Sequence, residues 1–188
     1  MSEKPYKANY DFALSYLKLG QKDAAIEALS MALSQVPDHE KNEKNNIYLS
    51  ILSTLAFLLV ENRDFENAAR YVEEGLAVKK EHADLLFVKS LLLLDMKRFD
   101  EMLETIIHYL LSVDKGDNEQ FNYKYIHEGV MDEIYGTLLP MASRYSVEYA
   151  KIRDIVQKLC KATGSERIKK AFDVMTKAET LRNDMADS

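Results

Sequence analysis

The chain has few of the residues that shape disulfide-rich, loop-rich or membrane-spanning proteins. Its 188 residues include one cysteine, three prolines, six glycines and no tryptophan. The single cysteine, Cys160, excludes an intramolecular disulfide and disfavours a thiolate metal site. Scarce glycine and proline, beside abundant Leu, Ala, Glu and Lys, favour helices. We therefore expect an all-α protein long enough for one compact domain with a sizeable core.

No stretch has the length and apolarity of a membrane span. Such a helix needs about 20 apolar residues, whereas the most apolar run, Leu85–Leu94, has ten positions and includes Lys89 and Ser90. The N-terminal sequence MSEKPYKANYDF has no apolar core of a signal peptide. These features predict a cytoplasmic protein that does not enter a membrane.

The charge balance argues against nucleic acid as a partner. The formal net charge is −6 and the sequence pI is about 5.3. Phosphate backbones and anionic membrane surfaces require a basic face, which this composition disfavours. At 47% apolar and 30% charged residues, the chain has the composition of a folded globular protein.

Motifs for catalysis, metal binding or cofactor binding are absent from the sequence. It contains no glycine-rich phosphate loop, no G-x-S-x-G and no H-E-x-x-H. The four histidines are scattered, so no two of them lie one helical turn apart as metal ligands would. His127 and Asp132 are close in sequence, but such a pair favours a structural role over acid–base catalysis. We predict no catalytic residue, no metal, no cofactor and no enzymatic activity.

A repeated pattern organises the N-terminal part of the chain. The segments NRDFENAARYVEEGL, from Asn62, and MKRFDEMLETIIHYL, from Met96, align at a constant offset of 34 residues. An earlier copy begins at Leu19, with an offset of 43 to the second copy. Its nine extra residues fit the polar stretch Asp38–Asn46, which predicts a lengthened surface loop.

A 34-residue period of paired helices resembles the tetratricopeptide repeat. Phe12, Ala13, Tyr16, Gly20, Ala25, Leu29, Ala32 and Pro37 follow the signature spacing of that family, as do Leu52, Leu55, Ala56, Leu59, Phe65, Ala68 and Gly75. The third copy keeps Leu86, Leu93 and Phe99 but has Met102 and Tyr109 at the small positions. The resemblance implies a superhelix of three helical hairpins over residues 7–113. A C-terminal helical region over 114–184 would cap it, within a single all-α domain of residues 1–188.

About three further helices are expected after the repeats. Apolar residues at helical spacing predict a helix over 121–139, ended or kinked by Pro140. Ser146 can cap the next helix, whose apolar residues are Val147, Ala150, Ile155 and Leu159. Gly164 and Ser165 predict a helix end followed by a helix start. The last helix has one apolar stripe: Ile168, Ala171, Phe172, Met175, Ala178 and Leu181.

The first helices of tetratricopeptide repeats line a concave groove, and the resemblance places the partner-binding residues there. By position, the groove residues are Tyr10, Leu14, Leu17, Phe57, Val60, Phe87, Leu91 and Leu94. Family members that clamp a C-terminal carboxylate use Lys, Asn and Arg at five groove positions. This chain has Tyr10, Leu14, Thr54, Asp84 and Val88 there, so that ligand is excluded.

The predicted function is a scaffold or adaptor whose apolar groove binds a peptide or an amphipathic helix of a protein partner. Two alternatives remain open. The groove could be filled by the C-terminal stripe Ile168–Leu181 or by a second copy in a homo-oligomer, since large apolar patches rarely stay uncovered. The layout also faintly resembles helical arms that accompany bacterial sugar-transferase or FkbM-type methyltransferase domains. In that case the chain would be a docking subunit or separated arm of a glycan- or protein-modifying transferase.

Overall fold

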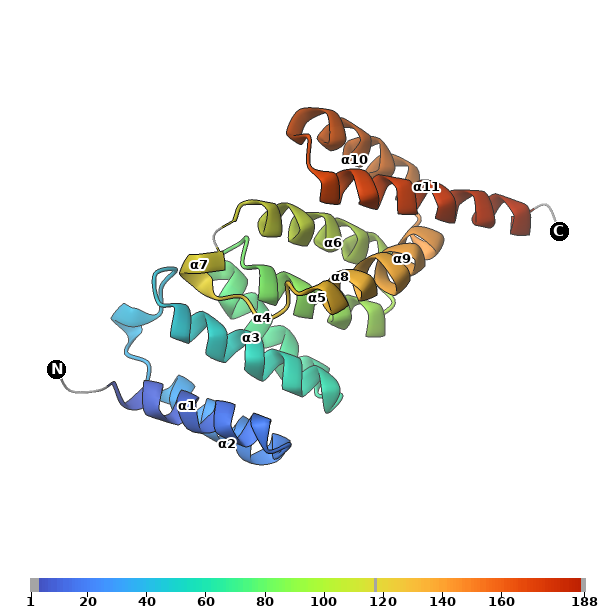
Figure 1. Cartoon of the computed structure of the whole chain (residues 1–188). Coiled ribbons are helices and arrows are strands. Elements are labelled where there is room, and N and C mark those ends of the chain that lie inside the picture. The colour runs from blue at the N-terminus through green and yellow to red at the C-terminus, as the bar shows by residue number, and fades with distance from the viewer. Residues whose placement is uncertain (1–3, 117, 187–188) are drawn as a thin grey trace. The chain divides into compact units, whose positions relative to one another are not determined.

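The fold is known from a computed structural model that describes residues 4–116 and 118–186. These residues form helices and connecting loops, with no β-strand among them. The chain divides into two compact units, residues 1–80 and 81–188, and Figure 1 shows the helices of both. The predicted all-α fold of helical hairpins is confirmed.

Unit 1 contains two helical hairpins. The first hairpin pairs α1 with α2, the second pairs α3 with α4, and α3 also packs on α1 and α2. A short 3-10 helix, η1, lies in the loop between the hairpins. The bounds are α1 (Pro5–Lys18), α2 (Lys22–Ser34), η1 (Asp38–Glu40), α3 (Asn46–Glu61) and α4 (Phe65–Val78).

Small residues lie where these helices meet. Ala13, Ala25, Ala56 and Ala68 each have no exposed surface, and a methyl side chain lets two helix backbones approach closely. Between the helices, α3 and α4 are also joined by Tyr48, whose hydroxyl donates to Glu74 at 2.6 Å. The repeat pattern in the sequence therefore corresponds to the contacts that hold each hairpin together.

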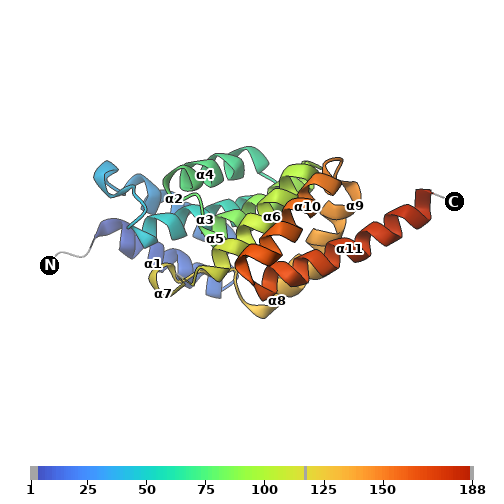
Figure 2. The ribbon, with the colours of Figure 1, turned by 90° about the horizontal axis from the view of Figure 1, so that it is seen from above.

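Unit 2 starts with the third hairpin, formed by α5 and α6, and continues into shorter and more varied helices. The α6 helix contacts α9, α10 and α11, and α11 also contacts α9 and α10; Figure 2 shows α10 and α11 as an antiparallel pair. The bounds are α5 (Ala83–Asp95), α6 (Phe99–Asp114), α7 (Asn118–Phe121), α8 (Glu128–Glu133), the π-helix η2 (Ile134–Leu138), α9 (Leu139–Tyr145), α10 (Tyr149–Thr163) and α11 (Glu166–Ala186).

The three hairpin turns share one backbone feature. Gly20, Arg63 and Lys97 occupy corresponding places in the repeats, and their φ angles are 72°, 61° and 56°. This left-handed conformation favours glycine, which is present only in the first turn. The turn geometry is thus conserved along the chain although the residue type is not.

The predicted helix over 121–139 is wrong in its first half. Residues 122–127 form no helix, and helical structure resumes at Glu128. The backbone N–H groups of Lys124 and Tyr125 donate to the carboxylate of Asp84 instead of to carbonyls within their own segment. A contact with a residue 40 positions earlier has therefore replaced the local hydrogen bonds of a helix.

Of the two outcomes predicted for Pro140, an end or a kink of the helix, the first does not occur. Pro140 lies in the first turn of α9, which follows η2 without a break. In η2 the backbone is wider, and the N–H of Leu139 donates to the carbonyl of Ile134, five residues earlier. Because proline has no N–H and its ring clashes with the carbonyl four residues before it, a π-turn at this point lets the helix pass through Pro140.

The predictions for the last two helices are partly confirmed. Gly164 ends α10 with a φ of 65°, and the Ser165 hydroxyl caps α11 by accepting from Ile168 N–H at 3.0 Å. Ser146, however, does not cap α10. Its hydroxyl donates to Asp100 at 2.6 Å, and Asp100 also accepts from the N–H of Glu148 at 2.9 Å. A carboxylate from the start of α6 thus takes the place of a local cap.

The apolar stripe of α11 packs within unit 2, whereas the expected stripe of α10 is shifted. Ile168, Ala171 and Met175 are fully buried, in a helix that contacts α6, α9 and α10. In α10 the buried residues are Tyr149, Ile152 and Val156. The predicted Val147 is 84% exposed and precedes the helix, and Ile155 is 46% exposed. The buried face of α10 is therefore formed by residues other than those predicted.

Candidate protein-binding faces

The predicted groove residues of unit 1 lie along α1 and α3. Leu14 and Leu17 in α1 and Phe57 and Val60 in α3 are half-buried, and Tyr10 is buried. Their spacings of three or four residues place each set on one side of its helix. Other residues of the same helices, such as Ala13 and Leu52, pack in the core. We call the set Tyr10, Leu14, Leu17, Phe57 and Val60 the unit 1 face.

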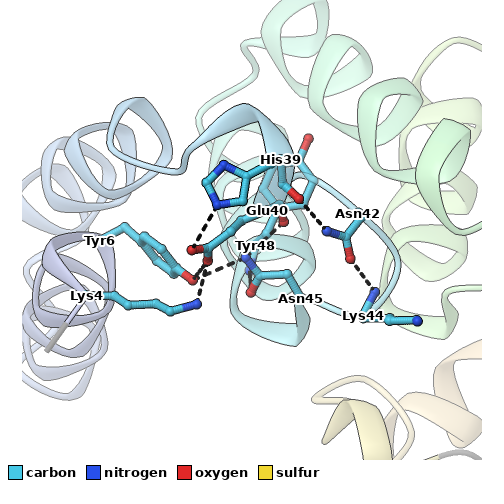
Figure 3. A network of polar contacts seen from close by, with 8 residues as sticks. All are labelled: Lys4, Tyr6, His39, Glu40, Asn42, Lys44, Asn45 and Tyr48. Atoms are coloured by element: carbon cyan, nitrogen blue, oxygen red, sulfur yellow. Dashed lines mark hydrogen bonds and ion pairs between the residues drawn. The ribbon is translucent and has the colours of Figure 1, made fainter. Parts of the chain in front are cut away.

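A polar network joins the start of α1 to the loop before α3. Figure 3 shows the Glu40 carboxylate facing the ends of Lys4 and Tyr6, which donate to it at 2.6 and 2.5 Å. Asn45 donates to the carbonyl of Glu40 at 3.1 Å and caps α3 by accepting from Tyr48 N–H at 3.2 Å. The hydrogen bonds from Lys4 and then Tyr6 hold the pKa of the Glu40 carboxyl below its ordinary value. The lengthened loop predicted from the sequence therefore contains this network.

A second ionic contact fastens the other end of the hairpins. Lys22 at the start of α2 lies 3.0 Å from Glu61 at the end of α3. Both side chains are more than a third exposed, so the pair contributes orientation more than stability. The Glu40 network thus joins the start of α1 to the loop before α3, and the Lys22–Glu61 pair joins the start of α2 to the end of α3.

The predicted groove residues of unit 2 are on α5, and they differ in accessibility. Phe87 is 5% exposed, whereas Leu91 and Leu94 are half-buried. The Phe87 ring packs against Tyr125, with ring centroids 5.3 Å apart, and against Tyr109 at 6.1 Å. The chain's own segment after α7 therefore covers Phe87 in this structure.

Asp84 holds the segment that covers Phe87, a role that was not predicted from the sequence. Its side chain is 2% exposed, and it accepts from the backbone N–H of Lys124 at 3.0 Å and of Tyr125 at 2.9 Å. Burial raises the pKa of the Asp84 carboxyl, and these hydrogen bonds offset the rise only in part. The available signal was a lone carboxylate inside the apolar run Ala83–Val88, because a buried charge needs donors.

An apolar cleft between α6 and α10 was also not predicted from the sequence. It has a volume of about 380 Å³. Ile107 and Leu111 line one side and Ile155 and Leu159 the other, with Glu104, His108, Ile152 and Val156 completing it. The spacing of four residues in each pair was the sequence signal, since it marks one side of a helix.

Chemical groups for catalysis do not converge on these faces. No cluster of three or more His, Cys, Asp or Glu side chains that could hold a metal ion occurs in residues 4–116 and 118–186. His127 and Asp132 are exposed. Cys160 is half-buried, and burial raises the pKa of its thiol, which lowers its reactivity. Over the same residues, every helix is too short or too polar to span a membrane.

Comparisons with known proteins agree with the repeat pattern. Residues 6–39, which contain the first hairpin, match the family model described as tetratricopeptide repeat. A solved structure titled "MamA RS-1 ArsTM double mutant" aligns with 97% of this chain and 98% of its own, with a TM-score of 0.50 and 16% sequence identity. A search of curated proteins finds no match. The structural likeness concerns the fold, and the matched hairpin identifies the repeat type. A tetratricopeptide repeat is therefore identified over residues 6–39.

Proposed function

We propose that this chain is a non-catalytic scaffold or adaptor that binds a protein partner through the unit 1 face. Tetratricopeptide repeats generally bind protein partners, and stacked repeats form extended binding surfaces. The proposal rests chiefly on one observation: Leu14, Leu17, Phe57 and Val60 are half-buried along α1 and α3, two helices that pack against each other. The acidic composition and the short apolar runs favour the cytoplasm as the place of action.

The chemistry of the face favours an amphipathic helix or an apolar peptide. Its middle residues are leucine, phenylalanine and valine, and exposed charges at Lys7, Lys18 and Glu61 border it. An apolar centre with a polar rim is the usual anatomy of a protein interface. Aromatic anchors contribute most of the binding energy in such interfaces, so Phe57 is the residue expected to matter most.

Paired substitutions of phenylalanine test this proposal. Phe57→Glu puts a charge on the unit 1 face, whereas Phe12→Glu changes a side chain that is 60% exposed on the outer side of α1. Binders are selected from a displayed library of helical peptides against the natural chain, and their affinities are measured by calorimetry. We expect Phe57→Glu to weaken binding by about 2 kcal/mol, which is roughly thirtyfold, and Phe12→Glu to leave it unchanged.

Circular dichroism shows whether both variants remain helical. Equal binding by the natural chain and the two variants would mean that the unit 1 face is not the site. The other two possibilities, an enzyme partner and a second copy of the chain, are distinguished by further measurements. An elution volume that stays constant over a wide concentration range excludes the second copy, and the enzyme is sought by photo-crosslinking from position 57.

A further inference from the structure

The segment from Phe121 to Tyr125 is held in unit 2 in the way that a bound peptide is held. It has no regular secondary structure beyond Phe121, and its main-chain groups bond to side chains of other elements. Asp84 of α5 accepts two of its N–H groups. The Tyr109 hydroxyl of α6 donates to the carbonyl of Tyr125 at 2.6 Å. The hairpin thus recognises the backbone of this segment through both a donor and an acceptor.

Aromatic side chains at alternating positions complete the contact. Phe121 and Tyr123 stack with ring centroids 5.7 Å apart, and both present their rings to His82, at 6.0 and 4.9 Å. Tyr125, two residues further on, packs on Phe87. Such ring pairs stabilise the contact beyond the effect of the area that they bury. His82 and Phe87 therefore form two successive sites for aromatic side chains.

We propose that the α5–α6 hairpin binds an extended peptide with aromatic residues at alternating positions, and that Phe121–Tyr125 is an internal ligand which such a peptide displaces. The proposal rests on the protein-binding function proposed above and extends it to unit 2. Asp84 supplies the main argument, because a buried carboxylate requires N–H donors from whatever occupies this face. A partner therefore needs two consecutive free backbone N–H groups between its aromatic residues, which excludes proline there.

Because the chain's own segment Phe121–Tyr125 occupies this site, a free peptide must displace it in order to bind. A tethered segment acts at an effective concentration of the order of millimolar, so a free peptide competes poorly with it. Once the internal aromatic residues are removed, the same peptide binds without that competitor. The difference in affinity between the two forms of the chain is thus the quantity that reports an internal ligand.

The first experiment supplies the segment as a separate peptide. The probe is a fluorescein-labelled peptide with the sequence of Gln120–His127, and the receptor is the full chain with Phe121→Ser, Tyr123→Ser and Tyr125→Ser. We expect fluorescence anisotropy to show binding at least about a hundredfold tighter than to the natural chain. A matched peptide methylated at the amide nitrogens of its lysine and third aromatic residue keeps every side chain, and should not bind.

Two aspartates of α5 provide the receptor control. Adding Asp84→Ala to the triple variant should abolish peptide binding, whereas adding Asp95→Ala should preserve it, because Asp95 is exposed at the end of the same helix. A triple variant that is helical by circular dichroism but does not bind the peptide would overturn the proposal. Equal binding of the methylated and unmethylated peptides would also overturn it.

The second experiment uses the natural chain and does not depend on the triple variant being folded. Residue-level hydrogen exchange compares the amides of Lys124 and Tyr125 with those of Ile106 and Ile107, which lie in the core of α6. A displaceable segment opens locally, so we expect its amides to exchange at least about tenfold faster. Exchange of both sets in a single global event would mean that the segment is part of the core, and would refute the proposal. Neither experiment involves Phe57, so failure here leaves the proposed role of unit 1 standing.

Discussion

Repeats two and three have different residues at one equivalent position. Putting the residue of either repeat into the other should destabilise the protein. Ala68 in α4 and Met102 in α6 are 34 residues apart in sequence, and neither side chain has exposed surface. We expect Ala68→Met to destabilise unit 1 by about 1–3 kcal/mol, because the closely packed helices have no room for three more heavy atoms. Met102→Ala should destabilise unit 2 by removing those same atoms.

The size of the second effect follows from burial. Three buried heavy atoms at about 0.8 kcal/mol each give about 2.4 kcal/mol. The cavity left behind raises this to about 3 kcal/mol, since the surrounding helices relax only in part. That free energy corresponds to roughly hundredfold faster exchange of protected amides. Met31→Ala is the matched control, because Met31 is 55% exposed on α2, and should change stability by less than about 0.5 kcal/mol.

Hydrogen exchange measured separately in each unit is the assay. It assigns each effect to the unit that carries the substitution, which a single thermal transition of a two-unit chain would not do. The packing argument is refuted if Ala68→Met leaves the exchange of α3 and α4 unchanged. It is equally refuted if Met102→Ala affects α5 and α6 no more than Met31→Ala does.

Two further predictions concern carboxylates of unit 2. Burial raises the pKa of Asp100, but hydrogen bonds from Ser146, Glu148 and Val147 outweigh this and leave the pKa below its ordinary value. Asp100→Ala should therefore destabilise unit 2 by about 1–2 kcal/mol in urea unfolding; no change would mean that these bonds are replaced by water. For Asp84 the sign is opposite. Its folded-state pKa lies above the ordinary 3.8, so its contribution to stability is present below that pH and is lost as the pH rises through the folded value. Asp84→Asn should remove this part of the pH dependence above 3.8, as measured by exchange in α5 and α6, and an unaltered pH profile would contradict the assignment.

The helical hairpins could be predicted because their determinants are local. Ala13, Ala25, Ala56 and Ala68 recur at fixed places, and the apolar residues around them follow the helical period. These contacts lie within one hairpin or between successive ones, so sequence spacing is enough to locate them. The positions of the unit 1 face follow from the same spacing.

The part of unit 2 that could not be predicted depends on contacts between distant residues. Tyr123, Ile126 and Val130 have the spacing of a helix, and nothing local opposes one. The carboxylate of Asp84 takes the N–H groups that such a helix needs, and a contact across 40 residues leaves no periodic trace. The cover over Phe87 was missed for the same reason. Periodicity predicts which side of a helix is apolar but not what lies on it.

The turns at Gly20, Arg63 and Lys97 have the same backbone conformation but differ in the strain that it causes. All three adopt a left-handed backbone, which costs a side-chain-bearing residue about 1–2 kcal/mol and glycine almost nothing. Repeat one is therefore free of a strain that its two relatives carry. Other contacts of each hairpin must offset this penalty at Arg63 and Lys97. Glycine at positions 63 and 97 would remove the strain, and the stability gained would widen the tolerance for mutations in the binding faces.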